Sequence, residues 1–250
     1  MNLTVLGSNA SGPSPGNPAS GYLVQAADTA VWMDCGPGTF AELGKRADPA
    51  GLDAVVISHR HVDHCADLLG LYSYLAYGVG ASSSVPVYAP PGLREVVAGF
   101  VGAGDDHVLH RVLEFHDIEP GDAVEVGGLS VQFGQAVHPV PAVVTRIDEG
   151  RSRLVYSGDT GPGGDLIELA TGVELLLCEA TLQGTRDAST YAYHLTAREA
   201  GEIAAIAGAS VLAVTHIPFT NDPQLTIDQA SSAFAGPIEY ALPGTTFTTE

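Results

Sequence analysis

The stretch HRHVDH, residues 59–64, decides the fold of this 250-residue chain. It follows the apolar run Ala54 to Ser58, which is typical of a buried strand, and it precedes a segment with helical spacing. Three imidazoles and one carboxylate within six residues have no use in packing, because a buried unpaired carboxylate destabilises the fold by several kcal/mol. The stretch therefore predicts a metal site at the carboxyl end of a strand.

The spacing within the stretch indicates two metal ions. On an extended chain, residues i and i+2 point the same way, so His59 and His61 can bind one ion together. Asp63 and His64, at the start of the helical segment, turn toward a second ion.

A site for two metals needs more ligands, and these must come from other strand ends. Three polar residues follow apolar strands with a Gly or Pro turn nearby: His138, Asp159 and His216. A carboxylate can bridge two cations whereas an imidazole cannot, so Asp159 is the natural shared ligand. His138 then completes one metal site and His216 the other.

The composition is that of a globular chain with one large core, since 45% of its residues are hydrophobic and only 16% are charged. Short β-branched runs punctuated by Gly and Pro alternate with helical segments, and this order recurs twice. One of the expected helices covers Cys65 to Ala76, and a buried strand is expected from Val211 to Thr215. No linker or internal repeat interrupts the pattern, so residues 1–250 are expected to form a single domain.

Charge and cysteine content exclude several classes of protein. Ten Lys and Arg residues against 29 Asp and Glu leave a net charge of −19, which excludes an extended nucleic-acid-binding surface. Three widely spaced cysteines argue against a disulfide framework and favour a reducing compartment. The chain has no signal peptide and no long apolar stretch, so we expect a cytoplasmic protein that does not contact a membrane.

With these motifs the chain resembles the metallo-β-lactamase superfamily, whose His-x-His-x-Asp-His motif is matched at residues 59–64, and within it the ribonuclease Z-like group. The resemblance implies an α+β fold, an αββα sandwich of two mixed β-sheets with helices on the outer faces. The segment WMDCGPGT, residues 32–39, resembles that group's Asp-Cys-Gly loop. Asp34 is thereby expected to orient the ligand histidines from behind.

Two further segments resemble the group's catalytic loops. Residues 178–181, CEAT, resemble a His-Glu-Ala-Thr loop with cysteine in place of histidine, and residues 194–197, HLTA, resemble a His-Ser-Thr-Ala segment. The resemblance implies that His194 is a proton donor held by Glu179. The residues agree, because Thr196 suits a helix N-cap with a glutamate three positions on, which leaves the ring of His194 free to face a site.

The expected chemistry is hydrolysis with two divalent metal ions, which activate water and bind the oxygens of a phosphoryl group. Zinc is the leading candidate for a His and Asp ligand set, with manganese or iron as alternatives. Asp63 would accept or orient the proton of the water, and His194 would protonate the departing oxygen. Asp63, Glu179 and His194 are thus the expected catalytic residues.

The substrate is expected to be a small phosphodiester such as a cyclic nucleotide. The tRNA-processing members of the group carry a long arm between the positions equivalent to His138 and Asp159, which here are only 21 positions apart. The short-armed chain looks most like bacterial cyclic-nucleotide phosphodiesterases of this fold. Members of the group are commonly homodimers, and the tyrosine-rich stretch from Leu68 to Gly80 could supply the interface.

Three alternatives stay open. The same scaffold could hydrolyse a lactone, thioester or β-lactam, which dispensable His194 and Glu179 would favour. It could be a ribonuclease Z that processes tRNA 3′ ends without the usual arm. It could also be a noncatalytic metal-binding or redox module, although di-iron members of the superfamily usually have Glu at the position of His61.

Overall fold

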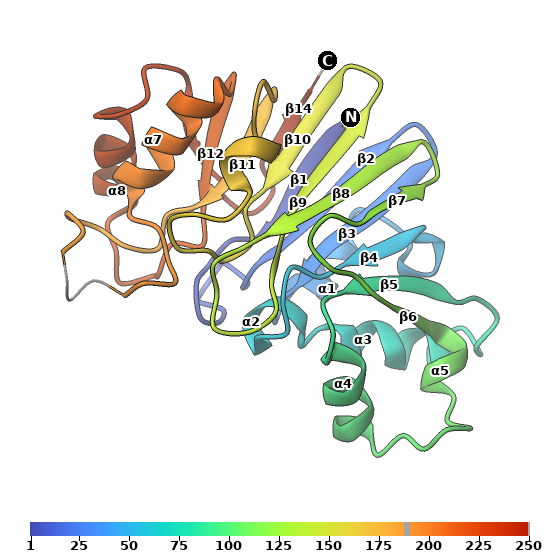
Figure 1. Ribbon diagram of the computed structural model, residues 1–250. Helices are drawn as coiled ribbons and strands as arrows, with labels where there is room; N and C mark the ends of the chain where they lie inside the picture. Colours follow the sequence, from blue (N-terminus) through green and yellow to red (C-terminus); the bar gives the residue numbers. More distant parts are fainter. Residues whose placement is uncertain (188–190, 250) are drawn as a thin grey trace.

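Two seven-stranded sheets pack face to face in the computed structural model, which describes residues 1–187 and 191–249 (Figure 1). The first sheet has the order β14-β1-β2-β3-β4-β5-β6 and the second the order β13-β12-β11-β10-β9-β8-β7. The strands of the first sheet are β1 (Asn2–Gly7), β2 (Gly21–Ala26), β3 (Thr29–Cys35), β4 (Ala54–Val56), β5 (Val85–Ala89), β6 (Leu113–Asp117) and β14 (Thr246–Thr248). Those of the second are β7 (Ala123–Val126), β8 (Leu129–Gln135), β9 (Val143–Glu149), β10 (Ser152–Tyr156), β11 (Leu175–Glu179), β12 (Val211–Thr215) and β13 (Ile238–Tyr240).

Helices cover the outer face of each sheet. Over the first sheet lie α1 (Thr39–Leu43), a 3-10 turn (Pro49–Gly51), α2 (Val62–Cys65), α3 (Leu68–Ser73), a π-helical turn (Tyr74–Gly78), α4 (Leu93–Val101) and α5 (Leu109–Val112). Over the second lie α6 (Leu166–Leu169), α7 (Ala197–Ala207) and α8 (Pro223–Ser231). Both sheets mix antiparallel and parallel pairs, so the expected αββα sandwich is confirmed.

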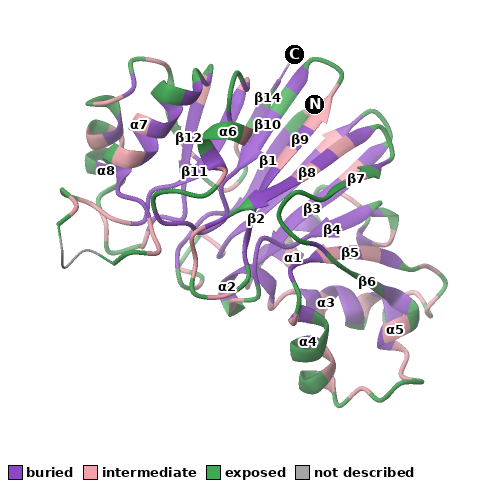
Figure 2. Ribbon diagram, viewed as in Figure 1, coloured by how far each residue is buried: buried purple, intermediate pink, exposed green. Residues whose placement is uncertain are grey.

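Alternation along the strands builds three apolar layers (Figure 2). In β3, Val31 and Met33 pack between the sheets, whereas Trp32 packs against the outer helices. In β11, Leu177 faces the same central layer and Cys178 faces α7 and α8. Because successive side chains point to opposite faces, strands buried on both sides read as continuous apolar runs.

The helix expected from Cys65 to Ala76 is wrong as a single element. It divides into the end of α2, then α3 and the π-helical turn. At the break, the N–H of Asp67 donates to the carbonyl of Cys35 at 2.7 Å, and its carboxylate accepts from the N–H of Phe40 at 2.8 Å. Asp67 therefore joins this segment to the start of α1 and does not continue the helix.

All seven predicted ligands lie at one edge of the sandwich. The strands β1, β3, β4, β8, β10, β11 and β12 end there, and their following loops meet across the gap between the two sheets. The isolated bridge between Asn9 and Ile217 joins the two sheets at this edge. In residues 1–187 and 191–249, no helix has the length and apolar composition that crossing a bilayer requires.

Candidate active site

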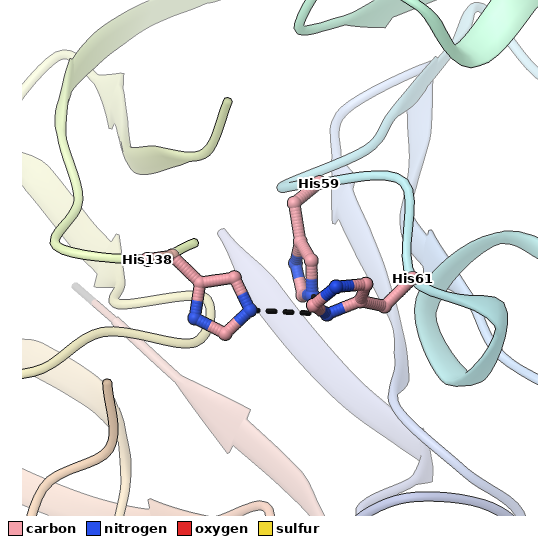
Figure 3. A group of neighbouring side chains, drawn as sticks. All are labelled: His59, His61 and His138. Carbon is pink, nitrogen blue, oxygen red and sulfur yellow. Dashed lines mark hydrogen bonds between the residues drawn. The ribbon is translucent and has the colours of Figure 1, made fainter. Parts of the chain in front are cut away.

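The first cluster of potential ligands, which we name the open triad, consists of His59, His61 and His138. Nδ1 of His61 lies 3.0 Å from Nε2 of His59 and 3.0 Å from Nε2 of His138. Figure 3 shows His138 reaching toward the other two from the loop after β8. His61 and His138 are half-buried, whereas His59 is fully buried. Three ring nitrogens thus converge on one point between the sheets.

The second cluster, which we name the closed triad, consists of Asp63, His64 and His216. Oδ2 of Asp63 lies 3.4 Å from Nε2 of His216 and 3.7 Å from Nε2 of His64. All three residues are buried. Each triad brings its ligand atoms within 4.8 Å of one another, as a single metal ion requires of its ligands.

Asp159 lies between the two triads. Its Oδ2 is 3.9 Å from Nε2 of His59, and its Oδ1 is 3.3 Å from Nε2 of His64 and 3.4 Å from Nδ1 of His216. Within the described residues, Asp159 Oδ1 and His64 Nε2 are buried without a hydrogen-bond partner. Buried polar atoms are normally paired, so these two atoms fit the ligand set of a divalent cation. The residues present therefore fit a two-metal site.

Asp34 holds His64 from behind. Its Oδ2 lies 2.7 Å from Nδ1 of His64 and accepts hydrogen bonds from Tyr156 and Ser58, each at 2.8 Å. The N–H of Ser58 donates to Oδ1 at 2.7 Å. Nε2 of His64 is thereby directed into the site, in the arrangement by which a carboxylate orients a ligand histidine. Asp34 itself has φ of 51°, a strained conformation for a non-glycine residue.

Burial and the neighbouring charges shift the pKa values of several site residues in opposite directions. Burial, together with His64, lowers the pKa of His59 well below its usual value, and burial lowers that of His138 to about 4. Burial alone would also lower the pKa of His64, but Asp159 and Asp34 outweigh it and raise this pKa. Although burial favours the neutral acid, His216 and His64 lower the pKa of Asp159 and of Asp63. The carboxylates are therefore ionised, as metal ligands must be.

Glu179 and His194 form a pair beside the closed triad. Nδ1 of His194 lies 2.9 Å from Oε1 of Glu179, which is fully buried and also accepts from the N–H of Thr160 at 2.8 Å. Burial opposes protonation of His194, but the hydrogen bond and charge of Glu179 outweigh it and raise the pKa of His194. A ring nitrogen of His194 lies within 4.8 Å of both Asp159 and His216. The pair can therefore deliver a proton to a group bound there.

Several contacts at the site escaped the sequence reasoning. Thr181 Oγ1 lies 2.9 Å from Nδ1 of His216, and the backbone N–H of Ser11 donates to Oδ2 of Asp63 at 2.8 Å. Ser58 and Tyr156 bind Asp34, and this contact was not predicted either. Their only signal in the sequence is that each stands close to a predicted ligand. Cys178, which replaces the group's histidine, packs against the helices and points away from the site.

This fold and this set of ligands define a metallo-hydrolase. A family model described as "Beta-lactamase superfamily domain" matches residues 29–217, and the chain belongs to this superfamily and to its ribonuclease Z-like group. The uncharacterized protein Rv1339 of Mycobacterium tuberculosis is 35% identical over 99% of this chain and 92% of its own length.

Two further relatives are similar over nearly the whole chain. The probable metallo-hydrolase YhfI of Bacillus subtilis is 28% identical over 98% of each chain, and its crystal structure superposes with a TM-score of 0.86 over 99% of each chain. A protein named ribonuclease Z from Myxococcus xanthus is 27% identical over 98% of this chain and 97% of its own.

Proposed function

We propose that the chain hydrolyses small phosphodiesters, with a cyclic nucleotide as the preferred class of substrate. The observation that carries this proposal is the Glu179–His194 pair at the edge of the two-metal site. A phosphodiester has a poor leaving group, an alkoxide, which needs a proton as it departs. Hydrolysis of a thioester makes a smaller demand on such a donor, because a thiolate can depart without a proton.

The residues divide the work as follows. His59, His61 and His138 would hold one metal ion and Asp63, His64 and His216 the other, with Asp159 shared. The ions, when bound, supply an activated water and charge stabilisation for the phosphoryl oxygens. Asp63, whose carboxylate faces both His64 and His216, would accept or orient the proton of the water. His194, kept protonated by Glu179, would donate a proton to the departing oxygen.

The connection between His138 and Asp159 favours a small substrate. The hairpin of β9 and β10 occupies most of it, and the hairpin is part of the second sheet. No protruding arm lies between these two residues. The net charge of −19 adds repulsion against a large polyanion. The ribonuclease Z of Myxococcus xanthus aligns over 299 positions and so contains segments that this chain lacks.

Two finer features belong to the same proposal. Zinc suits the ligand set of imidazoles and carboxylates, with manganese or iron as alternatives. A homodimer through residues 68–80 is supported by the exposure of Tyr77, whose side chain is 69% exposed on this segment. Elemental analysis of protein purified without added metal, and light scattering against the 25.7 kDa chain mass, test these two features.

The test compares leaving groups. Metal-loaded wild type and His194→Ala are assayed with cyclic AMP, cyclic GMP and bis(p-nitrophenyl) phosphate. The variant should lose about 10²- to 10⁴-fold in kcat on the cyclic nucleotides, since the general acid is gone. It should lose much less on the nitrophenyl ester, whose leaving group departs without a proton. The matched control is His116→Ala, a histidine on β6 outside the site.

Two outcomes would contradict the proposal. One is the absence of hydrolysis of all three phosphodiesters beside rapid cleavage of a lactone, thioester or β-lactam, with His194→Ala unchanged. The other is an equal loss on good and poor leaving groups, which would deny His194 the role of proton donor.

Ribonuclease Z activity is the second candidate, favoured by the similarity to the Myxococcus xanthus protein over nearly its whole length. Incubation with a precursor tRNA tests it directly. Cleavage at the 3′ end at a rate comparable to that on cyclic AMP would replace the first proposal.

A further inference from the structure

Two tyrosine rings adjoin the predicted metal ligands, in a loop that the proposed reaction does not use. The ring centroid of Tyr193 lies 6.3 Å from that of His138, and the centroid of Tyr191 lies 5.5 Å from that of His194. Tyr193 is half-buried, while 53% of Tyr191 is exposed. The rings therefore adjoin both the open triad and the proton donor, and they are accessible from solvent.

The geometry of the two rings suits a flat aromatic ligand. Their centroids are 5.5 Å apart and their planes meet at 72°, so one ring can offer its face where the other offers its edge. An aromatic ring carries a negative face and a positive edge, and a third ring packs favourably on either. A phosphoryl group that reaches the predicted ligands has its substituents within reach of this pair.

The backbone that carries the two rings is anchored to the scaffold at Tyr191, Ala192 and His194. Arg186 donates to the carbonyl of Tyr191 at 3.1 Å and to that of His194 at 2.5 Å, and it pairs with Glu199 at the start of α7. The backbone of Ala192 lies directly against Gly161, where a Cβ would come within 1.9 Å of the Ala192 carbonyl oxygen. The backbone at the two tyrosines is thus held in place before a ligand arrives, which lowers the entropic cost of binding.

Arginine and lysine side chains can provide little of the affinity for a ligand at the two rings. The chain has only ten Lys and Arg residues, and Arg186 is already occupied by Glu199 and by backbone carbonyls. Arg60, between two predicted ligands, extends along Gly92. The metal ions would bind the phosphoryl group, so an uncharged contact with a ligand ring would add affinity at the other end of the ligand.

We propose that Tyr191 and Tyr193 form a binding wall for the nucleobase of the substrate and so select nucleotides over other phosphoesters. The inference rests on the proposed phosphodiesterase function and adds to it the residues that determine specificity. Stacking on an aromatic side chain strengthens binding by about 5- to 100-fold per base and tolerates different bases. Both cyclic AMP and cyclic GMP are then accepted.

Equilibrium binding tests the wall separately from catalysis. Metal-loaded protein is titrated by calorimetry with AMP and with ribose 5-phosphate, which shares the phosphate and the sugar but lacks the base. Wild type should bind AMP about 5- to 100-fold more tightly. The variant Tyr191→Leu/Tyr193→Leu should lose this preference with little change in affinity for ribose 5-phosphate. The Phe/Phe variant should keep it, because the rings remain.

Control variants keep the test decisive. Phe100→Leu, an exposed aromatic residue on α4, should keep the preference for AMP. If the double variant does not fold, Tyr191→Leu alone tests the more exposed ring and should weaken the preference. Equal binding of the two ligands by wild type, or an unchanged preference in the leucine variants, would overturn the inference. Hydrolysis of bis(p-nitrophenyl) phosphate by the same samples shows whether the proposed function fails as well.

Discussion

The open and closed triads differ in how the protein holds them. In the closed triad, Asp34 lies 2.7 Å from Nδ1 of His64, and Thr181 lies 2.9 Å from Nδ1 of His216. In the open triad, Ser58 lies 3.1 Å from Nδ1 of His59, and the carbonyl of Tyr193 lies 3.4 Å from Nδ1 of His138. Within the described residues, the ring of His61 has no hydrogen bond outside its triad. One triad is buried and supported by a carboxylate, and the other is half-open to solvent.

This difference indicates that the two metal ions would bind with unequal affinity. A carboxylate behind a ligand histidine raises its basicity and fixes its orientation, which strengthens metal binding. The closed triad also contains a carboxylate ligand, Asp63, whereas the open triad consists of neutral imidazoles alone. We therefore expect the closed triad to bind first and to release its ion last.

The largest effect is expected from Asp159→Asn, which removes the carboxylate between the triads. Both ions lose a ligand, so kcat should fall by roughly 10³-fold or more, as when a cooperating catalytic unit is removed. Steady-state kinetics and elemental analysis measure the loss. Asp105→Asn, an exposed carboxylate, is the control. If Asp159→Asn keeps full activity and metal content, the residue is not shared between two ions.

A comparison of His61→Ala with His64→Ala tests whether the two triads bind metal with unequal affinity. The first should keep one tightly bound ion in the closed triad, whereas the second should lose the tighter ion and bind the remaining one weakly. Each should lose about 10²-fold or more in kcat, since both ions take part. Calorimetric metal titration of the metal-free proteins distinguishes the two. Identical binding curves for both variants would show that the triads are equivalent.

Asp34→Asn is expected to act mainly on the closed triad, because Asp34 contacts His64 directly and reaches His59 of the open triad only through Ser58. It removes the charge behind His64 and should weaken metal binding at the closed triad by about 10- to 100-fold, with a comparable loss of activity. Ser58→Ala, which removes the hydroxyl beside Nδ1 of His59, should have a smaller effect on the open triad. Competition with a chromogenic chelator measures both, and circular dichroism checks the fold. A larger loss of metal affinity in Ser58→Ala than in Asp34→Asn would contradict the expectation that the closed triad is the more strongly supported one.

The smallest effect is expected from Glu199→Gln, which lies outside both triads. Glu199 caps α7 with Thr196 and binds Arg186. Glutamine can keep the capping contact, so the variant loses mainly the ion pair with Arg186, and the free energy of unfolding should fall by about 1 kcal/mol or less. Thermal unfolding of the metal-free proteins measures the difference, and an unchanged midpoint would contradict it.

The same variant has a predictable pH dependence. Burial alone would raise the pKa of Glu199, but Arg186 and Thr196 lower it below its unfolded value. The stabilisation is therefore fully present above the unfolded pKa and is lost as pH falls through the folded pKa. The difference between wild type and Glu199→Gln should persist at pH 7 and shrink below about pH 4.

The sequence predicted the fold and the side chains that cluster at the edge of the sandwich better than the residues that support them. Asp159 and His216 could be selected as candidate ligands because a polar residue directly after an apolar strand is unusual. The contacts of Ser58 and Tyr156 with Asp34 could not be predicted, because hydroxyl groups are common and Asp34 is far away from both residues in the sequence. Whether a hydroxyl reaches a carboxylate depends on the packing of two sheets, which no local pattern reports.

Secondary structure shows the same limit. The strand from Val211 to Thr215 was predicted with its observed ends, because a continuous apolar run marks a strand buried on both faces. The strands β13 and β14 were not predicted, since three residues are too few for a period. The helix α8 was also missed, although Asp222 followed by Pro223 is a recognisable start.

The position of the site across both sheets has a consequence for assembly of the protein. Four of the predicted ligands stand after a strand of the first sheet: His59, His61, Asp63 and His64. The other three stand after strands of the second sheet: His138, Asp159 and His216. Neither half of the chain can form the full coordination shell by itself, so a dinuclear centre can mature only after the two sheets have docked. Bound ions would then clamp the halves together, and mass action would make thermal resistance rise with the concentration of free metal.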